Sequence, residues 1–251
     1  GGHSTVYGYD AYDNLVSVTD PNGNAIGNAY DVLGRKTGMS DPDMGTWSYG
    51  YDALGQMTSQ TDAKGQTTAI GYDKLGRAVV RSESGQYSTW TYGASASNHN
   101  VGKLVWSQAC TASDCAAVIS AKTVTYDGYG RPSSTVTTVD GASHTYAEGY
   151  DAAGRLSTVR YPSGFVAKYV YNGYGYLTQI ADNGSGTAYW TANGLDAEQH
   201  VVSETAGNGV TTSRTFDATT GLITNIRAGA NNAVAAFDYG FDTLGNFTYR
   251  S

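Results

Sequence analysis

The sequence has little charge, few prolines and no long apolar run. Charged residues occupy 15% of its 251 positions, and only four prolines interrupt the chain. The fifteen basic residues are scattered, and the net charge is −7. Nucleic-acid binding needs a cationic surface that displaces counterions, so no nucleic-acid partner is expected. No stretch approaches the roughly 18 consecutive apolar residues of a membrane-spanning helix, so no membrane span is expected either.

Residues that build reactive sites are also scarce. The four histidines have no common spacing with serine or aspartate, so no catalytic triad can be proposed. The glycine-rich residues 184–186 lack the lysine of a phosphate loop. A calcium loop at residues 20–31 would need glycine at its sixth position and glutamate at its twelfth, where this sequence has Ala25 and Asp31. We therefore expect no catalytic, cofactor-binding or metal site.

Glycine and tyrosine are abundant, with 33 and 21 residues, and threonine, serine and asparagine are frequent too. Tyrosine and threonine favour strands, whereas glycine, asparagine and aspartate favour turns. No stretch has the charge pattern of a solvated helix. The composition therefore predicts an all-β chain with many short strands.

A short motif recurs along the whole chain. Tyr-Asp-x-x-Gly at residues 30–34 returns at residues 51–55 and 72–76, at intervals of 21 residues. Further copies begin at Tyr9, Tyr126, Tyr150, Tyr171, Phe216 and Phe241, with degenerate copies at Tyr92 and Leu195. The series predicts one array of about eleven repeats over residues 1–251, with an irregular insertion at about residues 93–122.

Each repeat is expected to contain two tight turns. Asp-x-x-Gly suits a type I turn, because the aspartate side chain accepts hydrogen bonds from the turn backbone and the glycine takes a left-handed conformation. A weaker turn lies about midway between motifs, as in residues 20–23 and 62–65. Strands of roughly six residues between the turns would form a continuous antiparallel ribbon. The predicted structural turn residues are Asp31, Gly34, Asp52, Gly55, Asp73, Gly76, Asp127, Gly130, Asp151 and Gly154.

These recurring aspartates could be mistaken for catalytic carboxylates. An enzyme needs one site rather than one per repeat, and no pair is set apart as the acid and base of a glycosidase. The arginines that follow the turn glycine are expected to pack or pair along the ribbon, and these are Arg35, Arg77, Arg131 and Arg155. We therefore expect that the chain is not an enzyme.

Some turns carry a leucine where a free edge would favour a polar residue. Leu33, Leu54, Leu75 and Leu244 hold this position, and a neighbouring winding of the same ribbon could cover them. About 22 strands at roughly 4.8 Å spacing give a sheet about 105 Å wide. Closed into a ring, that sheet would be about 33 Å across, too wide for side chains to fill. The pattern favours a curved ribbon that encloses a lumen or forms an open arc.

The Tyr-Asp-x-x-Gly-Arg motif at this spacing resembles the Rhs/YD repeats of bacterial Rhs toxins, insecticidal toxin complexes and teneurins. The resemblance runs over the whole chain and implies β-hairpins in a ribbon wound as a spiral or hollow shell. In bacterial members that shell encloses a toxic C-terminal domain. The resemblance therefore implies flanking repeats and an enclosed effector as partners. It also implies export, to the medium or the cell surface, as part of a larger protein.

The two ends of the sequence lead to a further expectation. Residues 1–10 carry no visible signal peptide, and both ends fall inside repeats. We expect the chain to be a fragment of a longer protein.

Two functions fit this reading. The first and favoured one is a non-catalytic wall of a shell that holds a toxin or another effector. The second is an extracellular surface-binding module whose exposed aromatic residues contact carbohydrate or protein. The placement of Trp47, Trp90, Trp106 and Trp190 separates the two, because an exposed row of tryptophans would favour binding.

Both cysteines, Cys110 and Cys115, lie in the predicted insertion. A local disulfide is the preferred interpretation, and closing so short a loop would contribute about 2 kcal/mol. A metal site lacks a second pair of ligands, and two free thiols are the third alternative. A disulfide would fit a secreted or surface protein.

Overall fold

The computed structural model describes residues 4–113 and 115–251. These residues form 22 β-strands and one three-residue 3₁₀-helix, η1 (Ala230–Asn232). The chain divides into two compact units. The first comprises the residues up to Arg131 together with Val136–Ser143, and the second comprises Pro132–Thr135 and His144–Ser251. No helix in the described part of the chain is long and apolar enough to cross a membrane.

The strands follow the repeat pattern closely. Eleven lie in the first unit: β1 (Val6–Tyr9), β2 (Leu15–Thr19), β3 (Ala25–Tyr30), β4 (Lys36–Asp41), β5 (Gly45–Tyr51), β6 (Met57–Thr61), β7 (Thr67–Tyr72), β8 (Ala78–Glu83), β9 (Gln86–Tyr92), β10 (Leu104–Cys110) and β11 (Val118–Tyr126). Two strands have residues in both units: β12 (Pro132–Val139) and β13 (Ala142–Tyr150). The second unit holds β14 (Leu156–Arg160), β15 (Val166–Tyr171), β16 (Leu177–Asp182), β17 (Ala188–Leu195), β18 (Val201–Ala206), β19 (Thr211–Phe216), β20 (Ile223–Ala228), β21 (Ala235–Phe241) and β22 (Phe247–Arg250).

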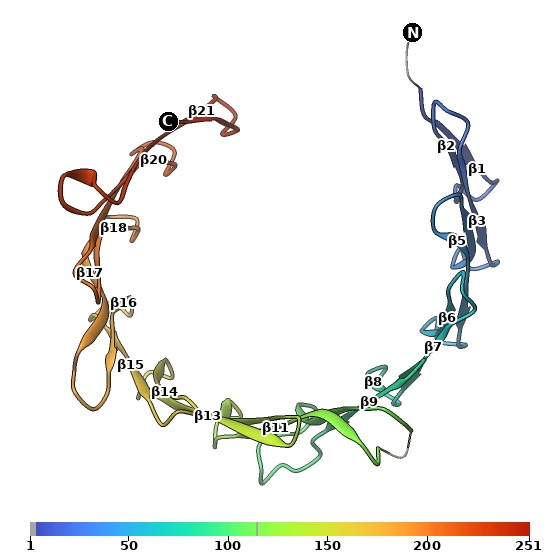
Figure 1. The fold of residues 1–251 in the computed structure, drawn as a ribbon, viewed down its shortest axis with the longest axis horizontal. Coiled ribbons are helices and arrows are strands. Elements are labelled where there is room, and N and C mark those ends of the chain that lie inside the picture. Colours follow the sequence, from blue (N-terminus) through green and yellow to red (C-terminus); the bar gives the residue numbers. More distant parts are fainter. Residues whose placement is uncertain (1–3, 114) are drawn as a thin grey trace. The chain divides into compact units, whose positions relative to one another are not determined.

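Every strand pairs antiparallel with its neighbours in chain order inside each unit. In the first unit the pairing runs without interruption from β1 to β11 (Figure 1). In the second it runs from β13 to β22. The expected all-β, antiparallel ribbon of hairpins is therefore confirmed.

A register shift marks the end of most motif strands. It falls between Ala29 and Tyr30, between Gly50 and Tyr51, and between Gly71 and Tyr72. A left-handed glycine after a type I turn inserts one extra residue into the ladder, so the bulge is the direct product of the Asp-x-x-Gly turn. The bulge also fixes which face the following residue takes.

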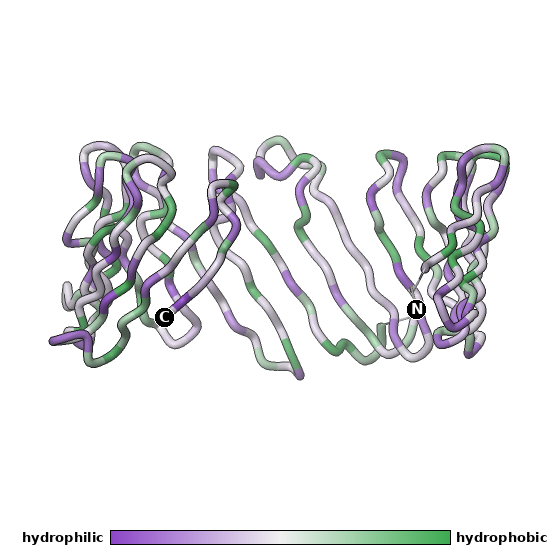
Figure 2. Tube along the Cα trace, turned by 90° about the horizontal axis from the view of Figure 1, so that it is seen from above, coloured by the Kyte–Doolittle hydropathy of each residue, from purple (hydrophilic) through white to green (hydrophobic). Residues whose placement is uncertain are grey.

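The ribbon is one layer thick and has almost no core. Among the described residues only five apolar side chains are buried, namely Cys110, Ala121, Ala167, Ala181 and Ala228. The accessible surface is 15371 Å², against the roughly 10,600 Å² expected for a compact chain of this mass. Apolar and polar stretches alternate over short distances along the backbone (Figure 2). Stability must therefore come from contacts within the layer.

The region predicted as an insertion is more regular than expected. Residues 93–122 contain β10 and the first part of β11, which pair with each other and with β9. Gly93 and Lys103 are joined by the same type of backbone hydrogen bond that closes a regular motif turn. The irregularity is confined to two long loops, at residues 93–103 and 111–117. In the sequence this turn is recognisable only as a degenerate copy at Tyr92, because Gly93 stands where the motif has aspartate.

Candidate functional site

The recurring turn is the most regular feature of the chain, and Asp31 illustrates its geometry. The backbone N–H of Gly34 donates to the Asp31 carbonyl at 3.0 Å, and the N–H of Asp31 donates to the Arg35 carbonyl at 2.9 Å. Asp31 Oδ1 accepts the N–H groups of Leu33 and Arg35 at 2.9 and 3.0 Å. Gly34 has φ +75°, a conformation that favours glycine.

The same geometry repeats at the other predicted turns. Asp52, Asp73, Asp127 and Asp151 each accept two turn N–H groups through Oδ1. The turn glycines Gly55, Gly76, Gly130 and Gly154 have φ between +74° and +83°. At each of these turns the aspartate accepts two turn N–H groups and the glycine has a positive φ.

At Asp31 and Asp73 the turn hydrogen bonds favour the charged carboxylate. The backbone N–H of Arg35 lowers the pKa of Asp31 below its ordinary value, and the Arg77 side chain does the same for the pKa of Asp73. A general acid needs a pKa raised toward the working pH, so the shift at both groups is in the wrong direction for that role.

At several repeats the residue after the turn glycine contacts the next repeat. Arg35 Nε donates to Asp31 Oδ2 at 2.7 Å, within its own turn. The same guanidinium lies over the ring of Tyr51, with Cζ 4.9 Å from the centroid, and donates to the Asp52 carbonyl at 2.9 Å. One side chain therefore holds two consecutive motifs together through an ion pair, a cation–π contact and a backbone hydrogen bond. We call this arrangement the clasp.

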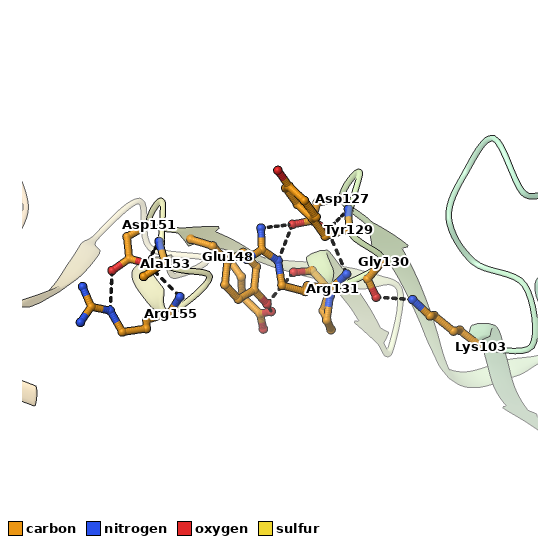
Figure 3. Close-up of polar contacts among 11 residues, drawn as sticks. Lys103, Asp127, Tyr129, Gly130, Arg131, Glu148, Asp151, Ala153 and Arg155 are labelled. Atoms are coloured by element: carbon orange, nitrogen blue, oxygen red, sulfur yellow. Dashed lines mark hydrogen bonds and ion pairs between the residues drawn. The ribbon is translucent and has the colours of Figure 1, made fainter. Parts of the chain in front are cut away.

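The part of the clasp that contacts the next motif ring recurs with different side chains in both units. Arg77 lies 4.1 Å from the Tyr92 ring, Lys103 lies 4.9 Å from Tyr126, and Arg155 lies 4.5 Å from Tyr171. His200 takes the same place, hydrogen-bonded to Asp196 at 2.9 Å and stacked on Phe216 at 4.3 Å. Figure 3 shows the ion pair within two motif turns, Asp127–Arg131 and Asp151–Arg155. It also shows Lys103 donating to the Gly130 carbonyl.

The motif tyrosine makes a second link, which sequence reasoning missed. Tyr51 Oη donates to the Lys36 carbonyl at 2.9 Å, at the start of the neighbouring strand β4, immediately after the preceding motif turn. The same bond joins Tyr30 to Leu15, Tyr72 to Met57, Tyr92 to Ala78, Tyr126 to Leu104, Tyr150 to Pro132, and Tyr171 to Leu156. A hydroxyl is needed for this bond, which explains why tyrosine recurs where any aromatic residue would pack.

The motif edge of the ribbon is strongly apolar at its tips. Val32, Leu33, Leu54 and Leu75 are between 71% and 100% exposed, and Leu244 is 86% exposed. The leucines predicted to lie inside the turns therefore point away from the layer and have no cover in the described chain.

The remaining candidates were the cysteines and the tryptophans. Cys110 and Cys115 are joined as a disulfide with a Cα–Cα distance of 5.0 Å, and Cys110 is buried. Trp47, Trp90 and Trp190 are half-buried, whereas Trp106 is 36% exposed. The tryptophans thus form no exposed row. Among the described residues no group of three or more side chains could hold a metal ion.

Comparison with known proteins agrees with this geometry. The family model described as RHS Repeat matches residues 1–25, 30–68 and 150–188. The matched residues have the RHS repeat, and this supports an Rhs/YD-repeat family. A search of curated proteins by sequence found no match.

Solved structures with the same fold include chains of TcdB2-TccC3 complexes. A chain in the crystal structure of TcdB2-TccC3-Cdc42 matches with a TM-score of 0.78 and 16% identity over 98% of the present chain. A chain of TcdB2-TccC3-TEV matches with a TM-score of 0.76 and 17% identity, and one of the Photorhabdus luminescens Tc holotoxin pore with 0.62 and 16%. The present chain spans only 14% to 15% of the length of these chains. At this identity the likeness establishes the fold.

Proposed function

We propose that this Rhs/YD-repeat chain is a non-catalytic segment of the wall of a hollow shell that encloses a toxin or another effector. The observation that carries the proposal is the clasp. A cationic or imidazole side chain at the end of one motif turn contacts the motif aromatic ring of the next, and the motif tyrosine donates a hydrogen bond to the start of the preceding strand. Such links make a single layer of strands mechanically continuous without a core. A wall needs that property, whereas an enzyme needs one converging site.

The exposed leucines at the turn tips support the same proposal. Exposing a row of apolar side chains to water along one edge is unfavourable in free energy, and such a row is typical of a surface that packs against another one. A further winding of the same ribbon would present a matching edge with the same two-strand period. In a longer shell the tips of Leu33, Leu54 and Leu75 would then be covered.

The similar structures add support at the level of fold. One of them is a structure of TcdB2-TccC3 that was determined without a hypervariable C-terminal region, which implies that the complex otherwise has one. By analogy, the cargo of the present wall would be a C-terminal segment of the same polypeptide, and the shell would be exported as part of a secreted toxin. A flat aromatic binding surface has less support, because three of the four tryptophans are half-buried.

Limited proteolysis of the full polypeptide that carries these repeats tests the proposal. Proteinase K should leave the C-terminal segment intact in the native protein, since the wall excludes the protease. Replacing both Arg35 and Arg77 by alanine should open the wall and shorten the lifetime of that segment. The matched control replaces Arg81 and Arg160, which take part in no clasp. Equal digestion of the segment in all three proteins would reject the container function.

A further inference from the structure

One motif turn has asparagine where most copies of the motif have aspartate. Residues 171–175 read Tyr-Asn-Gly-Tyr-Gly, whereas residues 126–130 read Tyr-Asp-Gly-Tyr-Gly. Asn172 Oδ1 accepts the backbone N–H groups of Tyr174 and Tyr176 at 3.0 Å each. The turn at residues 126–130, drawn in Figure 3, makes the same two bonds to its aspartate at 2.9 Å. The two turns therefore share one geometry and differ in a single side chain.

The residue after Asn172 leaves a backbone nitrogen open to reaction. A glycine that follows asparagine has no side chain to shield its nitrogen, which can approach the asparagine side chain closely. In the described part of the chain the Gly173 N–H has no hydrogen-bond acceptor. Gly173 is exposed, and no heavy atom lies within 4 Å of the place that a Cβ would take. Its nitrogen is therefore available as a nucleophile and is in contact with water.

The turn also polarises the carbon that this nitrogen would attack. Attack on Asn172 Cγ places negative charge on Oδ1, the atom that already accepts two backbone N–H groups at 3.0 Å. Donors about 2.7–3.1 Å from a developing oxyanion lower the barrier to its formation. The hydrogen bonds that hold the turn thus also stabilise the charge that forms in the reaction.

The chain has four other Asn-Gly pairs, and the structure protects each of them. In three pairs the glycine N–H already donates a hydrogen bond, with donor–acceptor distances of 2.6–3.1 Å; these glycines are Gly23, Gly184 and Gly209. In the fourth pair Asn193 lies within β17, and its Nδ2 donates to Thr205 Oγ1 at 2.7 Å. Residues 172 and 173 alone among the five pairs combine a free nitrogen with a polarised amide.

We propose that Asn172 is a site of intramolecular deamidation, converted to aspartate and isoaspartate through a cyclic imide. The Gly173 nitrogen loses its proton to hydroxide and bonds to Asn172 Cγ, the Cγ–Nδ2 bond breaks, and the amide leaves as ammonia. Water then opens the ring. Opening at Cγ gives aspartate, and opening at the main-chain carbonyl gives isoaspartate. The whole conversion consumes one water and releases one ammonia.

The aspartate product recreates the sequence of residues 126–130. Its carboxylate forms next to Tyr171, whose ring centroid lies 4.5 Å from the Arg155 guanidinium, so a cation is already close by. A charged acceptor also holds the two turn N–H groups more strongly than an amide does. Isoaspartate, in contrast, adds one atom to the backbone within the turn. The modification acts on one turn and does not depend on what the ribbon encloses, so it goes beyond the wall function.

Peptide mapping of the purified chain after prolonged incubation in mildly alkaline buffer tests the proposal. The mass gain that marks exchange of an amide NH2 for OH should appear at Asn172 at a rate about tenfold or more above that at each other pair. In guanidinium chloride, which removes the fold, all five pairs should react at similar rates. Reaction in the folded chain at Asn22, Asn183 or Asn208 as fast as at Asn172 would overturn the proposal, as would an unmodified Asn172.

Gly173→Pro removes the attacking N–H and leaves the asparagine in place. Proline fits the second position of a type I turn, and Gly173 does not have a positive φ. The variant should lose the mass gain at Asn172 and keep the circular dichroism of the native chain. Gly128→Pro, the same change in the turn at residues 126–130, is the matched control and should leave the reaction at Asn172 unchanged. Deamidation that persists at Asn172 in the Gly173 variant would reject the intramolecular route.

Discussion

The guanidinium of Arg35 lies 4.9 Å from the ring centroid of Tyr51, the motif tyrosine of the next repeat. The contact joins residues from consecutive motif turns of a ribbon that has no core beneath it. Because Arg35 also pairs with Asp31 in its own turn, the charge that stabilises one turn also holds the following one. This coupling between neighbours is how a one-layer repeat sheet gains cooperativity.

Gly55→Ala tests the conformation of the motif turn. Gly55 has φ +83°, and an added Cβ would meet no atom closer than Arg35 Nη1 at 3.9 Å, so the cost is conformational rather than steric. We expect a loss of about 1 kcal/mol in the free energy of unfolding, measured in urea. Gly128→Ala is the matched control, since that glycine has neither a positive φ nor a neighbour within 4 Å. Equal midpoints for the two variants would contradict the turn assignment.

Much of this turn could be predicted from the sequence, because its determinants are local. An aspartate, a glycine three residues later and a period of 21 residues define a hairpin with few alternatives. The clasp could not be derived in the same way. Arg35 and Tyr51 are sixteen positions apart, and their contact depends on the bulge at Tyr51, which sets the face of each side chain.

The turn that contains Gly93 was predicted only as a degenerate copy at Tyr92. Gly93 stands in place of the aspartate that marks the motif, and Lys103 in place of its arginine, so the region that holds β10 and the first part of β11 was interpreted as an insertion. The conformation of residues 94–101 depends on hydrogen bonds within the loop, which the motif spacing does not predict.

His200→Arg should strengthen the contact between two consecutive motif turns. The His200 ring is stacked on Phe216, and its Nδ1 lies 2.9 Å from Asp196 and 3.7 Å from Glu198. A guanidinium is always charged and has more donors than an imidazole, so the variant can pair with these carboxylates and still contact the Phe216 ring. The arginine variant should therefore be more stable than the native chain by about 0.5 kcal/mol, measured by urea unfolding at pH 8.

The exposed His144 gives a control for that experiment. His144→Arg adds the same side chain away from any motif turn and should leave the unfolding free energy unchanged. A His200→Arg variant that is no more stable than the native chain would show that the residue at position 200 does not link the two turns.

Acid should weaken the ribbon over a defined range. The backbone N–H of Arg35 lowers the pKa of Asp31, the side chain of Arg77 lowers that of Asp73, and the backbone N–H of Arg155 lowers that of Asp151. A pKa lowered in the folded state gives stability that is present above the unfolded value of about 3.9 and is lost as the pH falls further. The urea midpoint should thus fall steeply below about pH 4.

Asp73→Asn provides the check on this acid effect. The amide keeps much of the turn geometry but cannot titrate, so the variant should start less stable at pH 7 and lose less on acidification. If native and variant chains lose stability in parallel below pH 4, the turn carboxylate at position 73 does not contribute to the acid response.

The disulfide should form under oxidising conditions and stabilise the loop at residues 111–117. Cys110 is buried at the end of β10, and Cys115 lies in the loop that returns to β11. Mass spectrometry of the unreduced chain should find it lighter by two hydrogens than the reduced chain. Reduction should lower the unfolding free energy by about 2 kcal/mol. Two thiols that react freely with a maleimide in the native chain would contradict the linkage.

A double-mutant cycle on Arg35 and Tyr51 tests the interlocking of repeats most directly. Unfolding free energies are compared for the native chain, Arg35→Ala, Tyr51→Leu and the double variant, with Arg81→Ala replacing Arg35→Ala in a parallel control cycle. If the clasp joins neighbouring repeats, the Arg35 cycle should give a coupling energy of about 0.5–1 kcal/mol and the control cycle a value near zero. A coupling energy near zero in the Arg35 cycle would contradict the account.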